Sequence, residues 1–110
     1  MTLHRDLAAG RWMTLSLAEQ LGNVGSDVGR AIRARATGDT DRFGPALERA
    51  LELLDLTLAD ERWRGPRRRE IARAREVVCD YLAGENVYGS SDRSLEAYFM
   101  AYAFAARIDR

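Results

Sequence analysis

The chain has 110 residues, 46% of them hydrophobic, and its 17 basic residues balance its 17 acidic residues, so the formal net charge is zero. This length and apolar fraction indicate one domain with a single core, and they exclude an intrinsically disordered chain. The single cysteine, Cys79, has no partner for an internal disulfide, which favours a reducing cytoplasmic location. The N-terminus lacks the pattern of a signal peptide, and the longest uncharged run, 97–106, is too short to span a membrane.

Residues 1–13 are predicted to form a short lead-in, because Gly10 interrupts any long helix and His4 is the only histidine. The first strong helical pattern covers about 15–35, where Ser16 has the spacing of a capping box with Glu19. A core-facing stripe of leucine, valine and isoleucine recurs every three or four residues. Beside it, a stripe of small residues predicts close approach of another helix, with a kink as the alternative. This second stripe comprises Ala18, Gly22, Gly25 and Gly29.

A second helix is predicted over about 41–60, after a turn at Gly38. Its leucines form a core stripe, and Leu56 lies outside that stripe. Acidic residues line the opposite face, where we expect them to meet solvent or arginines; these are Glu48, Glu52 and Asp55. Di-metal helical bundles add histidines to such acids, and no histidine follows here, so we predict neither a metal site nor a cofactor.

The stretch 62–75 holds seven arginines and one acid, Glu70, which gives a local net charge of +6. Gly65 and Pro66 have the residue types of an N-cap and of the first helical position. A third helix is therefore predicted over about 66–83. All basic residues of the chain are arginines, whose planar guanidinium binds phosphate in a forked geometry.

The fourth helix is predicted over about 91–108, with Ser91 or Asp92 as its cap. Its middle part, 97–106, has no charged residue and is apolar on nearly every side. We expect part of this helix to face another copy of the protein; the alternative is a central helix covered by the other three. The predicted contacts of the homo-oligomer are Leu56, Tyr98, Met100 and Phe104.

Four helices with short loops predict an all-α fold, an up-down-up-down four-helix bundle over residues 14–110. In that arrangement the corner between the second and third helices lies at the same end as both chain termini. Arginines that are distant in the sequence would then form one positive end of the molecule. They are Arg5, Arg11, Arg62, Arg64, Arg67, Arg68, Arg69, Arg107 and Arg110.

This positive end is a candidate site for nucleic acid or another polyanion. The N-terminus of the third helix favours an anion, and Trp63 could stack on an unpaired base. The predicted contact residues are Arg62, Trp63, Arg64, Arg67, Arg68, Arg69 and Arg73. Alternatives stay open for the arginines: they are solvated, they pair with acidic stripes or across subunits, or they bind an acidic protein. For Trp63 the alternative is a hydrophobic plug at the end of the bundle.

Two segments together resemble a known group of proteins. They are Leu17 to Ile32, beginning Leu-Ala-Glu-Gln-Leu, and Phe43 to Leu58, containing Ala-Leu-Glu-Leu-Leu. The pairing resembles the bacterial four-helix-bundle proteins encoded by intervening sequences of 23S ribosomal RNA, and their relatives, the accessory variability proteins of diversity-generating retroelements. The resemblance covers about the first 60 residues. The short lead-in at 1–13 departs from the full first helix of that group.

The resemblance implies a small cytoplasmic helical bundle, often a ring-shaped homo-oligomer and typically a pentamer. It also implies a basic surface that interacts with nucleic acid or with a reverse transcriptase, and it implies no catalytic residues. A partner that processes nucleic acid is therefore a further expectation.

The sequence offers little for an enzyme, because general acid–base chemistry usually needs a placed histidine or two carboxylates in different environments. No nucleophile–base pair, glycine-rich phosphate loop or cluster of metal ligands is recognisable. We expect a non-enzymatic, homo-oligomeric helical-bundle protein that binds nucleic acid or another polyanion through its Arg/Trp-rich end. The alternative is a structural or adaptor oligomer that acts through protein–protein contacts without a nucleic-acid role.

Overall fold

The computed structural model describes residues 10–108, and four helices of 17 to 20 residues account for most of them. They are α2 (Leu17–Ala36), α3 (Thr40–Leu58), α4 (Pro66–Ala83) and α5 (Asp92–Ile108). No strand occurs within 10–108, so the all-α prediction is confirmed. Most of the predicted lead-in, including His4 and Arg5, and also Arg110 at the other end, lies outside the described residues.

The helix boundaries follow from local capping. Before α2, the Ser16 hydroxyl accepts a hydrogen bond from the Glu19 N–H (3.1 Å), and the Glu19 carboxylate accepts one from the Ser16 N–H (2.9 Å). This is the capping box that the sequence predicted. Asp39 caps α3 by accepting from the Arg42 N–H, and Ser91 precedes α5 and accepts from the Ser94 N–H.

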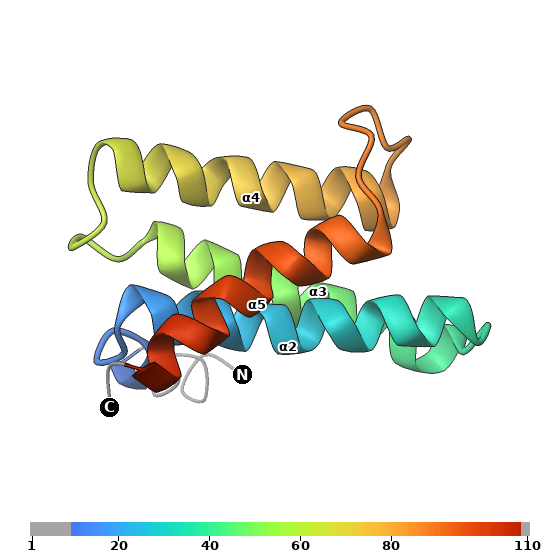
Figure 1. Cartoon of the computed structure of the whole chain (residues 1–110), viewed down its shortest axis with the longest axis horizontal. Helices are drawn as coiled ribbons and strands as arrows, with labels where there is room; N and C mark the ends of the chain where they lie inside the picture. The colour runs from blue at the N-terminus through green and yellow to red at the C-terminus, as the bar shows by residue number, and fades with distance from the viewer. Residues whose placement is uncertain (1–9, 109–110) are drawn as a thin grey trace.

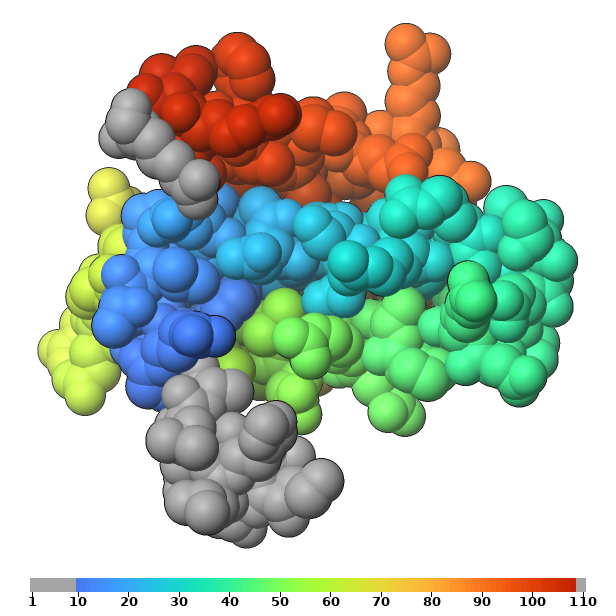
Figure 2. All heavy atoms as spheres, turned by 90° about the horizontal axis from the view of Figure 1, so that it is seen from below, coloured from blue at the N-terminus to red at the C-terminus, as the bar shows by residue number. Residues whose placement is uncertain are grey.

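α2 is the central element of the fold. It packs most extensively against α3 and α5, whereas α4 packs mainly on α3. Figure 1 shows α2, α3 and α4 along the long axis of the molecule and α5 crossing α2 obliquely. The view in Figure 2 places α2 between α3 and α5. The start of α2, the loop between α3 and α4 and the end of α5 all lie at the same end of the molecule, on the left of Figure 1.

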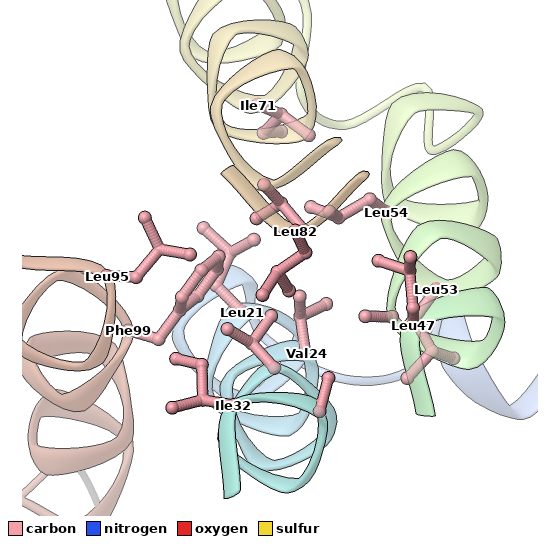
Figure 3. Close-up of a cluster of buried hydrophobic side chains, with 14 of the residues drawn as sticks. Leu21, Val24, Ile32, Leu47, Leu53, Leu54, Ile71, Leu82, Leu95 and Phe99 are labelled. Atoms are coloured by element: carbon pink, nitrogen blue, oxygen red, sulfur yellow. The ribbon is translucent and has the colours of Figure 1, made fainter. Parts of the chain in front are cut away.

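The core receives side chains from all four helices, as Figure 3 shows. Its best-covered members include Leu21, Val24, Leu54, Ile71 and Val78, each at most 1% exposed. Leu21, Val24 and Leu54 come from the stripes predicted for 15–35 and 41–60, so the helical periodicity identified the buried faces of α2 and α3. Among the described helices, none has the length and apolar character that a membrane crossing requires.

Helix α5 lies unusually close to α2 because two glycines of α2 face it. A methyl group added at Gly25 would lie 2.5 Å from Cβ of Phe99, and one added at Gly22 would lie 3.1 Å from Cα of Ala103. The predicted close approach is confirmed at these two glycines. Gly29 differs, because its nearest neighbour is the guanidinium of Arg33 on the same helix.

Candidate functional site

The corner between α3 and α4 is built on a buried carboxylate. Asp60, which is 3% exposed, accepts hydrogen bonds from the Arg62 guanidinium (2.7 Å), from the Arg62 backbone N–H (3.0 Å) and from the Gln20 side-chain amide (3.1 Å). These bonds, chiefly the one from the Arg62 side chain, lower the pKa of Asp60 to about 2, against an opposing effect of burial. Asp60 is therefore ionised and fully paired at neutral pH.

Gln20 connects this carboxylate to both tryptophans of the chain. Its side-chain carbonyl accepts from the indole N–H of Trp63 (2.8 Å), and its amino group also donates to the backbone carbonyl of Trp12 (2.9 Å). The indole N–H of Trp12 in turn donates to the hydroxyl of Thr57 (2.9 Å). Within the described residues, no buried side-chain polar atom of this or any other region lacks a hydrogen bond.

Trp63 is 9% exposed and belongs to the hydrophobic core. This position corrects the interpretation that Trp63 stacks on a nucleic-acid base, because its ring is covered by protein and its only donor is used inside. The alternative that the sequence left open, a hydrophobic plug at the end of the bundle, describes the residue.

The arginines that precede Gly65 already have partners in the protein. The Arg62 side chain donates to Asp60 and to the carbonyl of Leu15 (2.7 Å), and its guanidinium lies over the Trp63 ring at 4.5 Å. The hydrogen bond to Asp60 raises the pKa of Arg62. Arg64 pairs with Glu61 at 2.6 Å. These two arginines of the predicted set therefore contribute little free positive charge.

The three arginines directly after Pro66 occupy a different environment, whereas Arg75 further along α4 pairs with Asp55 at 2.7 Å. Arg67, Arg68 and Arg69 fill the first turn of α4, are exposed, and form no ion pair with an acid within residues 10–108. That turn contains no acidic residue, and Gly65 provides no side-chain cap for its free N–H groups. Helix N-termini attract anions through such N–H groups. This three-arginine turn is the basic patch that we carry forward.

Arg73 lies one helical turn beyond Arg69, and its guanidinium lies over the Tyr88 ring at 5.1 Å. The Tyr88 hydroxyl donates to Glu76 (2.9 Å). The ring contact positions Arg73 on the exposed side of α4 without neutralising it. Arg11 and Arg107 are also exposed, on segments that end beside the α3–α4 corner.

A second group of arginines lines an open cleft of about 850 Å³ between α2 and α3. Asp27, which is 4% exposed, pairs there with Arg30 (2.8 Å) and Arg49 (3.5 Å), and Arg42 pairs with Asp39 (3.5 Å). Acids and arginines nearly balance in this cleft, so it has much less free charge than the first turn of α4.

Helix α5 presents apolar side chains to solvent. Met100 and Phe104 are each 59% exposed, and Ile108 is 63% exposed. Tyr98 does not share this surface: it is half-buried, packs edge-on against Phe99 (5.0 Å) and donates to Glu70 of α4 (3.2 Å). Its burial raises the pKa of the Tyr98 hydroxyl. The predicted grouping of Tyr98 with Met100 and Phe104 is thus corrected.

Leu56 is also separate from the exposed face of α5. It packs against the core from α3, and α2 lies between α3 and α5 (Figure 2). A single contact surface therefore does not contain Leu56 together with Met100 and Phe104.

No group of three or more histidine, cysteine or acidic side chains within 10–108 has the geometry to hold a metal ion. Cys79 is half-buried and unpaired.

A groove of about 240 Å³ between α4 and α5 is lined mainly by apolar side chains, and its lining also includes Glu70 and Arg73. Glu70 accepts from the hydroxyls of both Tyr98 (3.2 Å) and Tyr102 (2.9 Å), which joins the two helices.

Comparisons with known proteins give no relative: no family model, curated protein or solved structure matches the chain.

Two residues that organise the corner, Gln20 and Asp60, were not predicted from the sequence. Gln20 lies in an amphipathic helix next to the core stripe, and Asp60 lies at a helix end, where acids are usually solvated. The one available signal was the pairing of Asp60 with Arg62 two residues later, a spacing at which a loop aspartate often binds nearby donors. Gln20 carried no such signal, because its partners lie 8, 40 and 43 residues away.

Proposed function

We propose that the protein is a non-enzymatic helical protein that binds a polyanion through the first turn of α4. One observation carries this proposal: Arg67, Arg68 and Arg69 are consecutive, exposed and unpaired with any acid of the described residues, at a helix start that lacks acidic side chains. Three cations fixed at a helix N-terminus present charge and N–H donors together, which suits a row of phosphates.

The proposal rests on an up-down-up-down four-helix bundle as the overall topology. The position of the α3–α4 loop beside the start of α2 and the end of α5 supports that topology (Figure 1). It also brings exposed Arg11 and Arg107 to the same end as Arg67, Arg68 and Arg69. Arg73 extends the patch along α4. The paired residues Arg62 and Arg64 and the buried Trp63 are no longer assigned to the contact.

Nucleic acid is the polyanion that we favour, because a guanidinium binds phosphate in a forked geometry and a nucleic-acid backbone offers several phosphates close together. The resemblance to proteins encoded by ribosomal intervening sequences makes RNA the first probe. Because Trp63 lies inside the core, the three-arginine turn has no aromatic ring on which a base could stack. We therefore expect binding with little sequence preference. An acidic or nucleic-acid-processing protein partner would use the same arginines.

The experiment compares two triple variants that remove the same charge. One replaces Arg67, Arg68 and Arg69 by glutamine; the control replaces Arg33, Arg42 and Arg93 by glutamine. These three are exposed, near the end of α2 and the starts of α3 and α5, away from the α3–α4 corner (Figure 1). Each phosphate contact contributes about 0.7 to 0.9 to the slope of log K against log salt. The first variant should therefore bind single-stranded RNA and duplex DNA about tenfold or more weakly, with a slope shallower by about 2.

The control variant should bind as the original chain does, and both variants should keep the helical circular dichroism signal. Equal loss in the two variants would mean that net charge alone governs binding. Unchanged RNA and DNA binding in the Arg67, Arg68 and Arg69 variant would refute the proposal.

A second candidate is a structural or adaptor oligomer without a nucleic-acid role. The observation that favours it is the solvent-exposed apolar surface of α5, with Met100, Phe104 and Ile108 at 59 to 63% exposure. Soluble monomers rarely leave a contiguous apolar surface on one helix uncovered. The two candidates are compatible, since a self-associating protein also binds polyanions. Sedimentation of the Phe104→Arg variant tests the second one, which predicts dissociation.

A further inference from the structure

The outward side of α5 forms a continuous apolar stripe. Its residues recur at steps of three and four, which places them on one face of the helix. All of them are exposed, and they are Ala97, Met100, Ala101, Phe104 and Ile108. The inward side is formed by other residues, among them Leu95 and Phe99, and lies against α2. The stripe is therefore not needed to fold the single chain.

Side-chain size is distributed unevenly along the stripe. The N-terminal part has Ala97 and Ala101, the middle has Met100, and the C-terminal part has Phe104 and Ile108. If two such helices packed in parallel, large residues would face large residues and Ala97 would face Ala97 across a gap. In antiparallel packing, Ile108 of each copy covers Ala97 of the other, and Phe104 lies against Met100 and Ala101. Only the antiparallel arrangement fills the interface evenly.

Charged residues at the edge of the stripe fit the same arrangement. Glu96 and Arg107 are exposed, and neither pairs with an opposite charge within residues 10–108. Eleven residues make about three helical turns, so the two side chains lie on the same edge. In an antiparallel pair, the same edges of the two helices meet. Glu96 of one copy then lies opposite Arg107 of the other, and the contact occurs twice.

We propose that two copies of the chain associate through α5, antiparallel, about a two-fold axis close to Ala101. The stripe is complementary to itself in both size and charge, which is the requirement for a two-fold interface. Such a dimer buries the exposed face of α5 in both copies. It therefore closes at two subunits, in contrast to the ring that the family resemblance implies. This inference gives the partner and geometry of the self-association in the second candidate function, on which it rests.

Disulfide trapping tests the orientation. On a Cys79→Ser background, we would prepare Ala97→Cys with an affinity tag and Ile108→Cys without one. Mild oxidation of the mixture should yield the mixed disulfide-linked dimer as the main product, because antiparallel packing brings these two positions together. Each variant oxidised alone should remain mostly uncrosslinked. Dimers of Ala97→Cys with itself, without the mixed product, would overturn the antiparallel arrangement while leaving self-association intact.

Charge reversal tests the edge contact in the equilibrium between monomer and dimer, followed by sedimentation. Glu96→Arg and Arg107→Glu should each raise the dimer dissociation constant at least fivefold, and the double reversal should restore it to within about twofold. Asp41→Arg, an exposed reversal on α3, is the control and should leave the constant unchanged. Failure of the double reversal to recover dimerisation would overturn the pairing of Glu96 with Arg107.

The mass of the assembly that the original chain forms in solution distinguishes the remaining ways in which the proposal could be wrong. A monomer at every concentration would overturn both the dimer and the adaptor function, and it would leave the binding of RNA by Arg67, Arg68 and Arg69 to be decided by its own salt titration. A closed assembly larger than two subunits would overturn the two-fold dimer while keeping self-association.

Discussion

The corner between α3 and α4 keeps its polar groups paired inside the protein, whereas α5 leaves apolar side chains uncovered outside it. In the corner, Asp60, Gln20 and Arg62 satisfy one another. On α5, Met100 and Phe104 face solvent although the same helix is closely packed on its other side. The contrast teaches that the availability of a side chain depends on its partners within the fold. Neither the number of arginines nor the number of apolar residues reveals it.

The largest expected effect concerns the carboxylate under the corner. Replacing Asp60 by alanine removes the acceptor for Arg62 and for the Gln20 amide, and we expect the free energy of unfolding to fall by about 3 kcal/mol. Urea denaturation at pH 7 measures this loss. Glu61→Ala is the matched control, because Glu61 is exposed and pairs with exposed Arg64; its cost should stay below about 1 kcal/mol.

The pH dependence sharpens the same prediction. The pKa of Asp60 is lowered from 3.8 to about 2, so its stabilising contribution is present above pH 4 and is lost as the pH falls through 2. The loss for this group is about 2 kcal/mol. Denaturation curves of the original chain and of Asp60→Ala should therefore converge between pH 4 and pH 2. Parallel curves over that range would show that Asp60 is not the titrating group.

A smaller effect is expected on the inner side of α5. In the Gly25→Ala variant, the added methyl group would lie 2.5 Å from Cβ of Phe99, so α5 must move away from α2. We expect a loss of about 2 kcal/mol in the free energy of unfolding, since overpacking costs more than alanine gains in helix propensity. In Gly44→Ala, no atom lies within 4 Å of the new methyl group. That variant should be unchanged or more stable by up to about 1 kcal/mol. Equal effects in the two variants would contradict the close packing of α5 against α2 at Gly25.

The smallest effect separates the two kinds of arginine. Arg62→Gln should lower the free energy of unfolding by about 1.5 kcal/mol, because it removes charge-assisted hydrogen bonds to buried Asp60. Arg68→Gln should change it by less than about 0.5 kcal/mol, because Arg68 is exposed and makes no ion pair in the described part of the chain. RNA binding should respond in the opposite order. If both variants lose the same stability, the distinction drawn at Gly65 does not hold.

The sequence predicted the helices well because their ends have local signals. The capping box at Ser16 and the Gly65-Pro66 pair lie within a residue or two of the boundaries in the structure. The small-residue stripe also predicted a close helix neighbour, although it could not identify α5 as that neighbour. Helical periodicity and capping act over a few residues, which is the range that sequence patterns describe.

The site was harder to predict because its organisation depends on distant partners. Trp63 looked like a stacking residue between two arginines, and its burial depends on Gln20, 43 residues earlier. Arg62 looked like one cation among seven, and its role is set by Asp60. The apolar character of α5 was visible in the sequence, but the division of its residues into a buried and an exposed face required the packing of Gly22 and Gly25 against it.

The hydrogen bonds of Gln20 have a consequence for how the protein opens. Its one side-chain amide is shared by the segment containing Trp12, by Asp60 after α3 and by Trp63 before α4. Detaching any one of these segments would strand a polar group in the interior. The segment containing Trp12 and the α3–α4 loop should therefore exchange their backbone amide protons as one cooperative unit, with a common opening free energy, even though more than 40 residues separate them in the sequence.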